Sequence, residues 1–221
     1  TSFRVLAVDL RNHGRSPHSD TLSYETMAED VLELMDSQHI GSSHILGHSM
    51  GGKVAMTLAL ANPTRVSKLI VVDIAPRSYR RLHDELLDAL MSVNLALFQS
   101  RHQIDEELAR KIPDRAIRQF LMKNLARDES GLFHWKANLA TISKNDEELS
   151  TEIVASTPFP NPTLFVKGKR SDYIVESDTP LIHRLFPKAR IELIDAGHWV
   201  HAESPDRFAD VVLNFLHSPA T

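Results

Sequence analysis

The run Gly47-His48-Ser49-Met50-Gly51 places a serine between two glycines, where a predicted strand meets a predicted helix. A sharp turn at this point would lift the hydroxyl of Ser49 above the edge of a sheet, and the glycines would relieve the crowding that such a turn creates. The amides that follow the serine would lie at a helix N-terminus, which favours developing negative charge. The pattern therefore predicts a nucleophilic serine at position 49.

A serine hydroxyl is a weak nucleophile and needs a base within hydrogen-bond reach. The chain has 12 histidines, so the base must be identified by its position relative to the predicted strands. His198 follows the last predicted strand, which places it at the same carboxyl edge of a parallel sheet as the Ser49 turn. His13 follows the first predicted strand at that edge and could line a pocket, whereas His48 is expected to point elsewhere from a tight turn. We therefore predict His198 as the base. The alternative is that His198 is a packed histidine of a loop, without a part in catalysis.

A carboxylate should orient the imidazole of His198. Asp73 ends the predicted strand KLIVVD, and Asp172 follows the strand TLFVK. Either residue gives the chain order serine, acid, histidine, and spacing alone leaves both open. Each could also be an aspartate that caps a loop.

The elements that must position these residues alternate along the chain. Short apolar runs predict strands at Phe3–Leu10, Ser43–Gly47, Lys68–Ile74, Thr163–Lys167 and Arg190–Ile194. Periodic apolar positions predict helices from Tyr24 to about His39, from Met50 to about Ala61, over Thr179–Phe186, and from Ser204-Pro205 onward. This order predicts an α/β fold, with a mostly parallel sheet covered by helices on both faces.

The segment 77–157 breaks the alternation. It is helical by periodicity, contains no convincing strand and is too long for a plain connection. We predict an inserted helical cap at 77–157, between core segments 1–76 and 158–221; ordinary connecting helices are the alternative. Six apolar residues of the cap could line an acyl pocket or form its core: Leu90, Met91, Phe98, Phe120, Leu121 and Trp135.

Composition narrows the class of protein. The 221 residues carry a formal net charge of −4, which argues against a nucleic-acid partner. Cysteine is absent, which leaves no disulfide framework, thiolate metal site or cysteine nucleophile. No window has the roughly 18 consecutive apolar residues of a membrane span. We expect a cytoplasmic location, or the mitochondrial matrix after removal of a transit peptide.

Four motifs together carry a resemblance: GHSMGGK, the following VVDIAP, the preceding DLRNHGRSPHS and the late AGHWVHAESP. The chain resembles the α/β-hydrolase superfamily, and within it the YbfF-like bacterial esterases and their α/β-hydrolase domain-containing relatives. The resemblance implies the α/β-hydrolase fold, Ser49 as nucleophile, His198 as base and the Met50 amide as an oxyanion donor. It implies Asp73 as the acid in the YbfF-like branch, and a position near Asp172 in the wider superfamily.

One departure from the family pattern concerns the beginning of the sequence. The superfamily takes a second oxyanion donor from a His-Gly loop after its third strand. Phe3–Leu10 matches the fourth family strand, so we expect the N-terminal strands and that loop to be missing from this chain.

The expected activity is that of a carboxylesterase-type serine hydrolase, which cleaves carboxylic esters with small or medium acyl chains through an acyl-enzyme. Thioester hydrolysis and acyl transfer to an alcohol use the same triad, and a non-catalytic binding protein of this fold is the alternative class. Trp199, Tyr173 and His13 are the predicted substrate-binding residues. The chemistry requires neither a metal nor an organic cofactor, the expected partner is a small-molecule ester, and the oligomeric state stays open.

Overall fold

The computed structural model describes residues 3–79 and 84–219, which form two compact units. Residues 24–79 and 151–221 make one, here called the sheet unit, and residues 1–23 and 80–150 make the other, here called the helical unit. The sequence-based division placed residues 1–23 with the core, whereas in the structure they group with the inserted segment. The interpretation of 77–157 as a cap stays a prediction.

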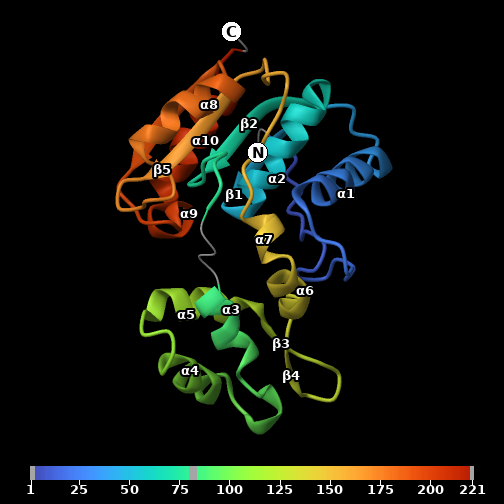
Figure 1. The fold of residues 1–221 in the computed structure, drawn as a ribbon, viewed down its shortest axis with the longest axis vertical. Helices are drawn as coiled ribbons and strands as arrows, with labels where there is room; N and C mark the ends of the chain where they lie inside the picture. Colours follow the sequence, from blue (N-terminus) through green and yellow to red (C-terminus); the bar gives the residue numbers. More distant parts are fainter. Residues whose placement is uncertain (1–2, 80–83, 220–221) are drawn as a thin grey trace. The chain divides into compact units, whose positions relative to one another are not determined.

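A four-stranded parallel sheet forms the centre of the sheet unit (Figure 1). Its strands are β1 (Ser43–His48), β2 (Val66–Val72), β5 (Thr163–Gly168) and β6 (Ala189–Ile194), in the spatial order β1-β2-β5-β6. Each neighbouring pair is parallel, so the carboxyl ends of all four strands meet at one edge. Together with the helices described next, this confirms the predicted α/β fold.

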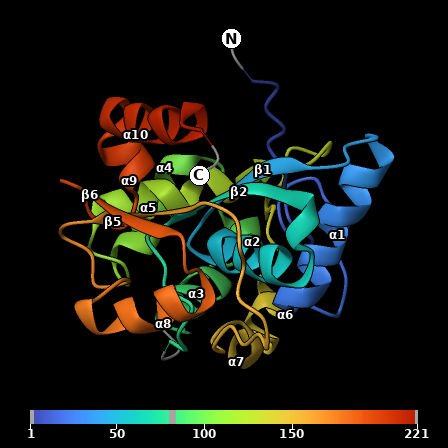
Figure 2. The ribbon, with the colours of Figure 1, turned by 90° about the horizontal axis from the view of Figure 1, so that it is seen from above.

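Helices cover both faces of this sheet, as seen from above in Figure 2. They are α1 (Tyr24–Ser37), α2 (Met50–Ala61), α8 (Thr179–Leu185), α9 (Val200–Glu203) and α10 (Pro205–His217), with short 3-10 turns η1 (Pro63–Arg65) and η4 (Glu176–Asp178). α9 and α10 lie on one face, and α1, α2 and α8 on the other. None of the helices in the described part of the chain is long and apolar enough to cross a membrane.

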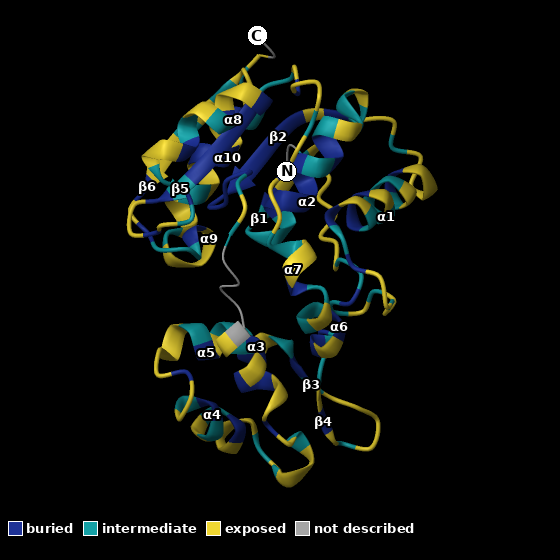
Figure 3. Ribbon diagram, in the orientation of Figure 1, coloured by how far each residue is buried: buried dark blue, intermediate teal, exposed yellow. Residues whose placement is uncertain are grey.

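β2 and β5 are buried on both faces, which explains their unbroken apolar sequences (Figure 3). Successive side chains of a strand point to opposite faces. Ile70 and Val72 accordingly pack in one cluster with Val211 and Phe215 of α10. Phe165 points to the opposite face, where its ring meets that of Phe186 at 5.7 Å. The two central strands thus hold the helical layers together and fix the edge at which the loops lie.

The predicted strand at Phe3–Leu10 is wrong. This segment has no regular secondary structure, and Val5 is 81% exposed. An apolar extended segment becomes a strand only when a neighbour supplies the ladder of hydrogen bonds. No strand within residues 3–79 and 84–219 pairs with it.

The helical unit contains α3 (Asp84–Met91), α4 (Arg101–Ala109), α5 (Arg115–Leu121), α6 (Leu139–Lys144) and α7 (Asp146–Leu149), with 3-10 turns η2 (Leu95–Leu97) and η3 (Met122–Asn124). It also contains an antiparallel hairpin of β3 (Leu125–Arg127) and β4 (Phe133–Trp135). The prediction that this segment has no strand is therefore wrong. Strands of three residues are too short for a periodic pattern to reveal them. Most of the predicted pocket candidates here belong to its core or pack against it: Leu90, Phe98, Leu121 and Trp135.

Residues 1–23 join the helical unit through two asparagines. Asn12 is fully buried, and its main-chain carbonyl accepts a hydrogen bond of 2.8 Å from the amide of Asn138. The side-chain amide of Asn138 donates to the side-chain oxygen of Asn12 at 3.1 Å. These contacts explain why a segment at the start of the chain groups with residues 80–150.

A buried lysine of α2 donates hydrogen bonds to the main chain of two other segments of the sheet unit, one after β2 and one before β5. Lys53 is 1% exposed, and its ammonium group donates to the carbonyl oxygens of Pro76 at 3.2 Å, Arg77 at 2.6 Å and Thr151 at 2.7 Å. Burial lowers the pKa of Lys53 to about 7, and the nearby Arg77 adds to this effect. The three carbonyl oxygens offset part of the cost of placing the charge there.

Substituting Lys53→Met is expected to lower the free energy of unfolding by about 2–4 kcal/mol, because buried carbonyl oxygens then lose their donor. Chemical denaturation followed by circular dichroism measures this change. The exposed Lys169→Met is the matched control and should stay within about 0.5 kcal/mol of the wild type. A change as small for Lys53→Met would contradict the role of the three contacts.

Candidate active site

The turn between β1 and α2 holds Ser49 in an unusual conformation. Its φ of 53° and ψ of −122° are strained for a residue with a side chain. The amide of Ser49 donates to the carbonyl of Val72 at 3.0 Å, which fixes the turn against β2. The predicted sharp turn between strand and helix is present, and Ser49 stands at its apex.

Of the two glycines that flank Ser49, the structure shows a need for Gly47 but not for Gly51, where an added Cβ atom would meet no described atom within 4 Å. Gly52 is the second crowded position. A Cβ atom at Gly47 would lie 2.0 Å from the carbonyl oxygen of Gly51. A Cβ atom at Gly52 would lie 2.6 Å from the Cγ2 atom of Ile74. Both positions therefore require glycine, the first to close the turn and the second to let α2 approach the end of β2.

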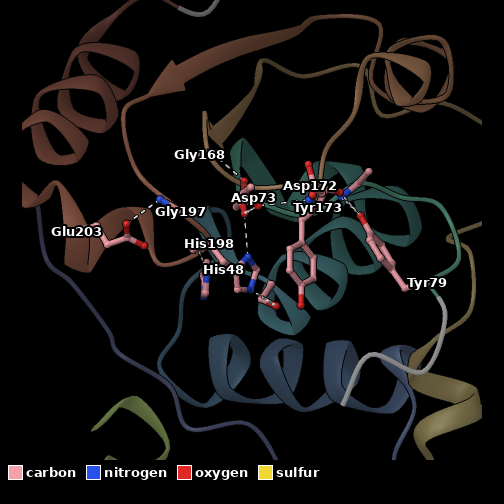
Figure 4. A network of polar contacts seen from close by, with 12 residues as sticks. His48, Asp73, Tyr79, Gly168, Asp172, Tyr173, Gly197, His198 and Glu203 are labelled. Atoms are coloured by element: carbon pink, nitrogen blue, oxygen red, sulfur yellow. Dashed lines mark hydrogen bonds and ion pairs between the residues drawn. The ribbon is translucent and has the colours of Figure 1, made fainter. Parts of the chain in front are cut away.

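His198 lies in the loop between β6 and α9 and faces both Ser49 and Asp73. Its Nε2 atom is 3.1 Å from the hydroxyl oxygen of Ser49, and its Nδ1 atom is 2.8 Å from Oδ2 of Asp73. Figure 4 shows the ring directly beside Asp73. With a proton on Nδ1 donated to the carboxylate, Nε2 is left as an acceptor for the serine hydroxyl.

Asp73 follows β2 directly and is fully buried, with a positive φ of 49°. The amide of Gly168 donates to Oδ1 at 2.9 Å, and the hydroxyl of Ser171 donates to Oδ2 through a short hydrogen bond. His198 is therefore one of three donors that converge on this carboxylate. Such an arrangement fixes the direction of both oxygens.

The alternative acid is placed differently. Asp172 is exposed, and its main-chain carbonyl accepts a hydrogen bond of 3.3 Å from the side chain of Arg77. The loop of Asp172 instead contributes the hydroxyl of Ser171 to Asp73. Sequence reasoning missed Ser171 because a serine in a polar loop gives no signal of its own, although it adjoins the candidate that was considered.

Two of the three predicted substrate-binding residues lie beside the base. The ring of Tyr173 stacks on the imidazole of His198, with centroids 3.8 Å apart and planes inclined by 18°. The ring of Trp199 meets the same imidazole edge-on at 5.7 Å. Burial raises the pKa of Tyr173, and the charge of Asp73 adds to this, so its hydroxyl stays protonated. His13 belongs to the helical unit, where its Nδ1 atom lies 2.9 Å from the carbonyl of Arg11.

The loop that carries His198 is held from the side of α9. The carboxylate of Glu203 accepts a hydrogen bond of 2.8 Å from the amide of Gly197 (Figure 4). Arg170 pairs with the same carboxylate at 3.0 Å and with Asp195. These contacts fix the backbone on the N-terminal side of His198.

His48 does not point away from the site, contrary to the prediction. Its Nε2 atom lies 2.9 Å from the carbonyl oxygen of His198, and the two rings are 4.6 Å apart. Burial lowers the pKa of His48 to about 4, and the neighbouring His198 adds to the effect. The turn at Ser49 is tight, as predicted, but the loop that carries His198 lies beside the ring of His48.

Within residues 3–79 and 84–219, no cluster of three or more histidine, aspartate or glutamate residues could hold a metal ion.

Comparison with known proteins gives consistent matches. A family profile described as "Alpha/beta hydrolase family" matches residues 1–211. The sn-1-specific diacylglycerol lipase ABHD11 of Danio rerio is 40% identical over 223 residues, which cover 98% of this chain and 70% of the relative. Esterase YbfF of Escherichia coli is 34% identical over 218 residues, covering 96% and 82%. A solved structure called a marine microorganism esterase is 44% identical, covers 94% of this chain and 82% of its own, and has a TM-score of 0.91.

Proposed function

The chain belongs to the alpha/beta hydrolase family and is a hydrolase of the carboxylic-ester class, and we propose that it works through a Ser49–His198–Asp73 triad. The observation that carries the proposal is the imidazole of His198, which lies 3.1 Å from the hydroxyl of Ser49 and 2.8 Å from the carboxylate of Asp73. At these distances Nε2 of His198 can take the proton of the Ser49 hydroxyl, and the carboxylate of Asp73 can accept the hydrogen bond of the Nδ1–H group.

The first half of the reaction forms an acyl-enzyme. The Ser49 oxygen attacks the carbonyl carbon of the ester, while Nε2 of His198 takes the hydroxyl proton. The charge that develops on the carbonyl oxygen is stabilised by the amide of Met50. This residue begins α2, where the first amides of a helix have no intrahelical acceptor. His198 then gives its proton to the leaving alcohol.

The second half releases the acid. Nε2 of His198 takes a proton from water, the resulting hydroxide attacks the acyl carbon, and the proton returns to Ser49 as the ester bond to the enzyme breaks. Throughout, the carboxylate of Asp73 accepts a hydrogen bond from the Nδ1–H group of His198 and takes no proton from it. Three donors to its carboxylate support this role.

We assign substrate contacts to Tyr173 and Trp199, whose rings flank His198. Their aromatic surfaces suit the apolar part of an ester with a small or medium acyl chain. His13 and the cap interpretation of 77–157 stay predictions from the sequence.

The test is hydrolysis of a series of p-nitrophenyl esters from acetate to laurate by the purified chain, with and without ethanol. We expect turnover that is highest for the short and medium chains, with the free acid as the main product. Formation of mostly ethyl ester would instead make the chain an acyltransferase on the same triad. Absence of turnover across the series, with a folded protein, would favour the non-catalytic alternative.

A further inference from the structure

His48 is a polar side chain beside the site that the proposed reaction does not use. It ends β1 and directly precedes Ser49, so its backbone belongs to the turn that presents the nucleophile. Its ring nitrogen Nε2 lies 2.9 Å from the carbonyl oxygen of His198, which is 150 residues away in the sequence. One side chain therefore links the strand end before the nucleophile to the loop of the base.

The contact defines the protonation of His48. A carbonyl oxygen only accepts, so Nε2 of His48 must carry the proton and Nδ1 must be the unprotonated nitrogen. The ring is packed between His198, at 4.6 Å, and the edge of His201, at 4.8 Å. The ionisable groups that face it are these two histidines and Asp73. Burial and the two histidines lower the pKa of His48 and keep the ring neutral, although the hydrogen bond to the His198 carbonyl and the charge of Asp73 oppose this.

The contact also complements the other attachments of the His198 loop. Glu203 holds the amide of Gly197, one residue before the base. His48 holds the carbonyl of His198 itself, on the opposite side of the residue. The imidazole of His198 must keep hydrogen-bond distance to two partners at once, and an error of about 1 Å in such a site costs on the order of 100-fold in rate.

We propose that His48 is a positioning residue, which fixes the distance between Ser49 and His198 by donating its Nε2–H to the carbonyl of His198. The inference rests on the proposed function, because it assigns the roles of nucleophile and base to these two residues. His48 does not touch the reacting atoms and exchanges no proton in the reaction. Its effect is therefore on the fraction of molecules in which the base faces the serine.

The experiment compares His48→Gln, which keeps a donor at a similar reach, with His48→Leu, which keeps the bulk but not the donor. We expect His48→Leu to lower kcat by about 10- to 100-fold with less than a threefold change in KM. His48→Gln should stay within about threefold of the wild-type kcat. His44→Leu, an exposed histidine of the same strand, is the matched control and should leave kcat unchanged. Thermal unfolding of each variant separates loss of fold from loss of alignment.

Two results would overturn the proposal: a kcat for His48→Leu within threefold of the wild type, or an equal loss in both His48 variants. Nitrogen NMR of the histidine rings gives a second readout that is independent of activity. The His48 ring should remain neutral with its proton on Nε2 from pH 5.5 to 8, and titration in this range or a proton on Nδ1 would contradict the contact. Full ester turnover by Ser49→Ala would refute the proposed function instead, and the NMR result would still decide whether His48 makes the contact.

Discussion

Replacing Ser49 with alanine is expected to lower kcat for ester hydrolysis by about 10⁴- to 10⁶-fold, the range found when a member of a triad is removed. The substitution deletes the atom that attacks the carbonyl, and water must then react without a covalent intermediate. KM should change little, because the remainder of the site is intact. Initial rates with a p-nitrophenyl ester measure kcat and KM. Mass spectrometry after treatment with a fluorophosphonate shows which serine the reagent labels.

The fluorophosphonate should label the wild type at Ser49 and leave Ser49→Ala unlabelled. An exposed serine of α1 provides the control, since Ser37→Ala should retain full turnover and full labelling. Retained activity in Ser49→Ala, or labelling of the wild type at another serine, would remove Ser49 from the reaction.

The four strands of the sheet could be predicted from the sequence because each is a short segment with apolar residues that lies between helices or loops with clear signals of their own. β2 and β5 are buried on both faces and could be recognised without any alternation. The helix predicted to run from Met50 to about Ala61 has these bounds in the structure, because the turn at Ser49 begins it and Pro63 follows its end. These are local signals. They predict the structure correctly where tertiary packing buries the same residues that the local pattern marks as apolar.

The errors in the fold came from features that depend on a partner. Phe3–Leu10 has the composition of a buried strand, but a strand also needs a neighbour, and composition does not show whether one is present. The β3–β4 hairpin pairs three residues with three, and its pattern is lost among the helices around it. In both places, tertiary pairing rather than propensity decides the secondary structure.

In the candidate site, too, some placements could be predicted from local sequence and others depend on tertiary contacts. That Ser49 and His198 lie together could be predicted, because each stands in a motif whose place after a strand fixes its edge of the sheet. The choice between Asp73 and Asp172 could not be made from the residues alone, because both follow strands that end at this edge. Their difference lies in direction. Asp73 has a positive φ and is directed into the interior, whereas Asp172 lies in an exposed loop. The contacts of Ser171 and His48 join residues 98 and 150 positions apart and leave no local trace.

Replacing Asp73 with asparagine is expected to lower kcat by about 10³- to 10⁴-fold while the protein stays folded. The amide has nearly the shape of the carboxylate. With its oxygen at the Oδ1 position it still accepts the hydrogen bond from the amide of Gly168, and its nitrogen then takes the Oδ2 position, which faces Ser171 and His198. The amide nitrogen donates a hydrogen bond to Nδ1 of His198, which forces the imidazole proton from Nδ1 to Nε2. A protonated Nε2 cannot accept the hydroxyl proton of Ser49. The loss therefore follows from the wrong tautomer rather than from a displaced ring.

Asp172→Asn is the matched control for this experiment, because it makes the same chemical change one strand away at an exposed position. We expect it to retain kcat within about twofold of the wild type. Nitrogen NMR of His198 separates the explanations, since the tautomer should change in Asp73→Asn and not in Asp172→Asn. A larger loss of kcat in Asp172→Asn than in Asp73→Asn would transfer the role of the acid to Asp172. In that event the 2.8 Å contact between Asp73 and His198 would have to be replaced by another during the reaction.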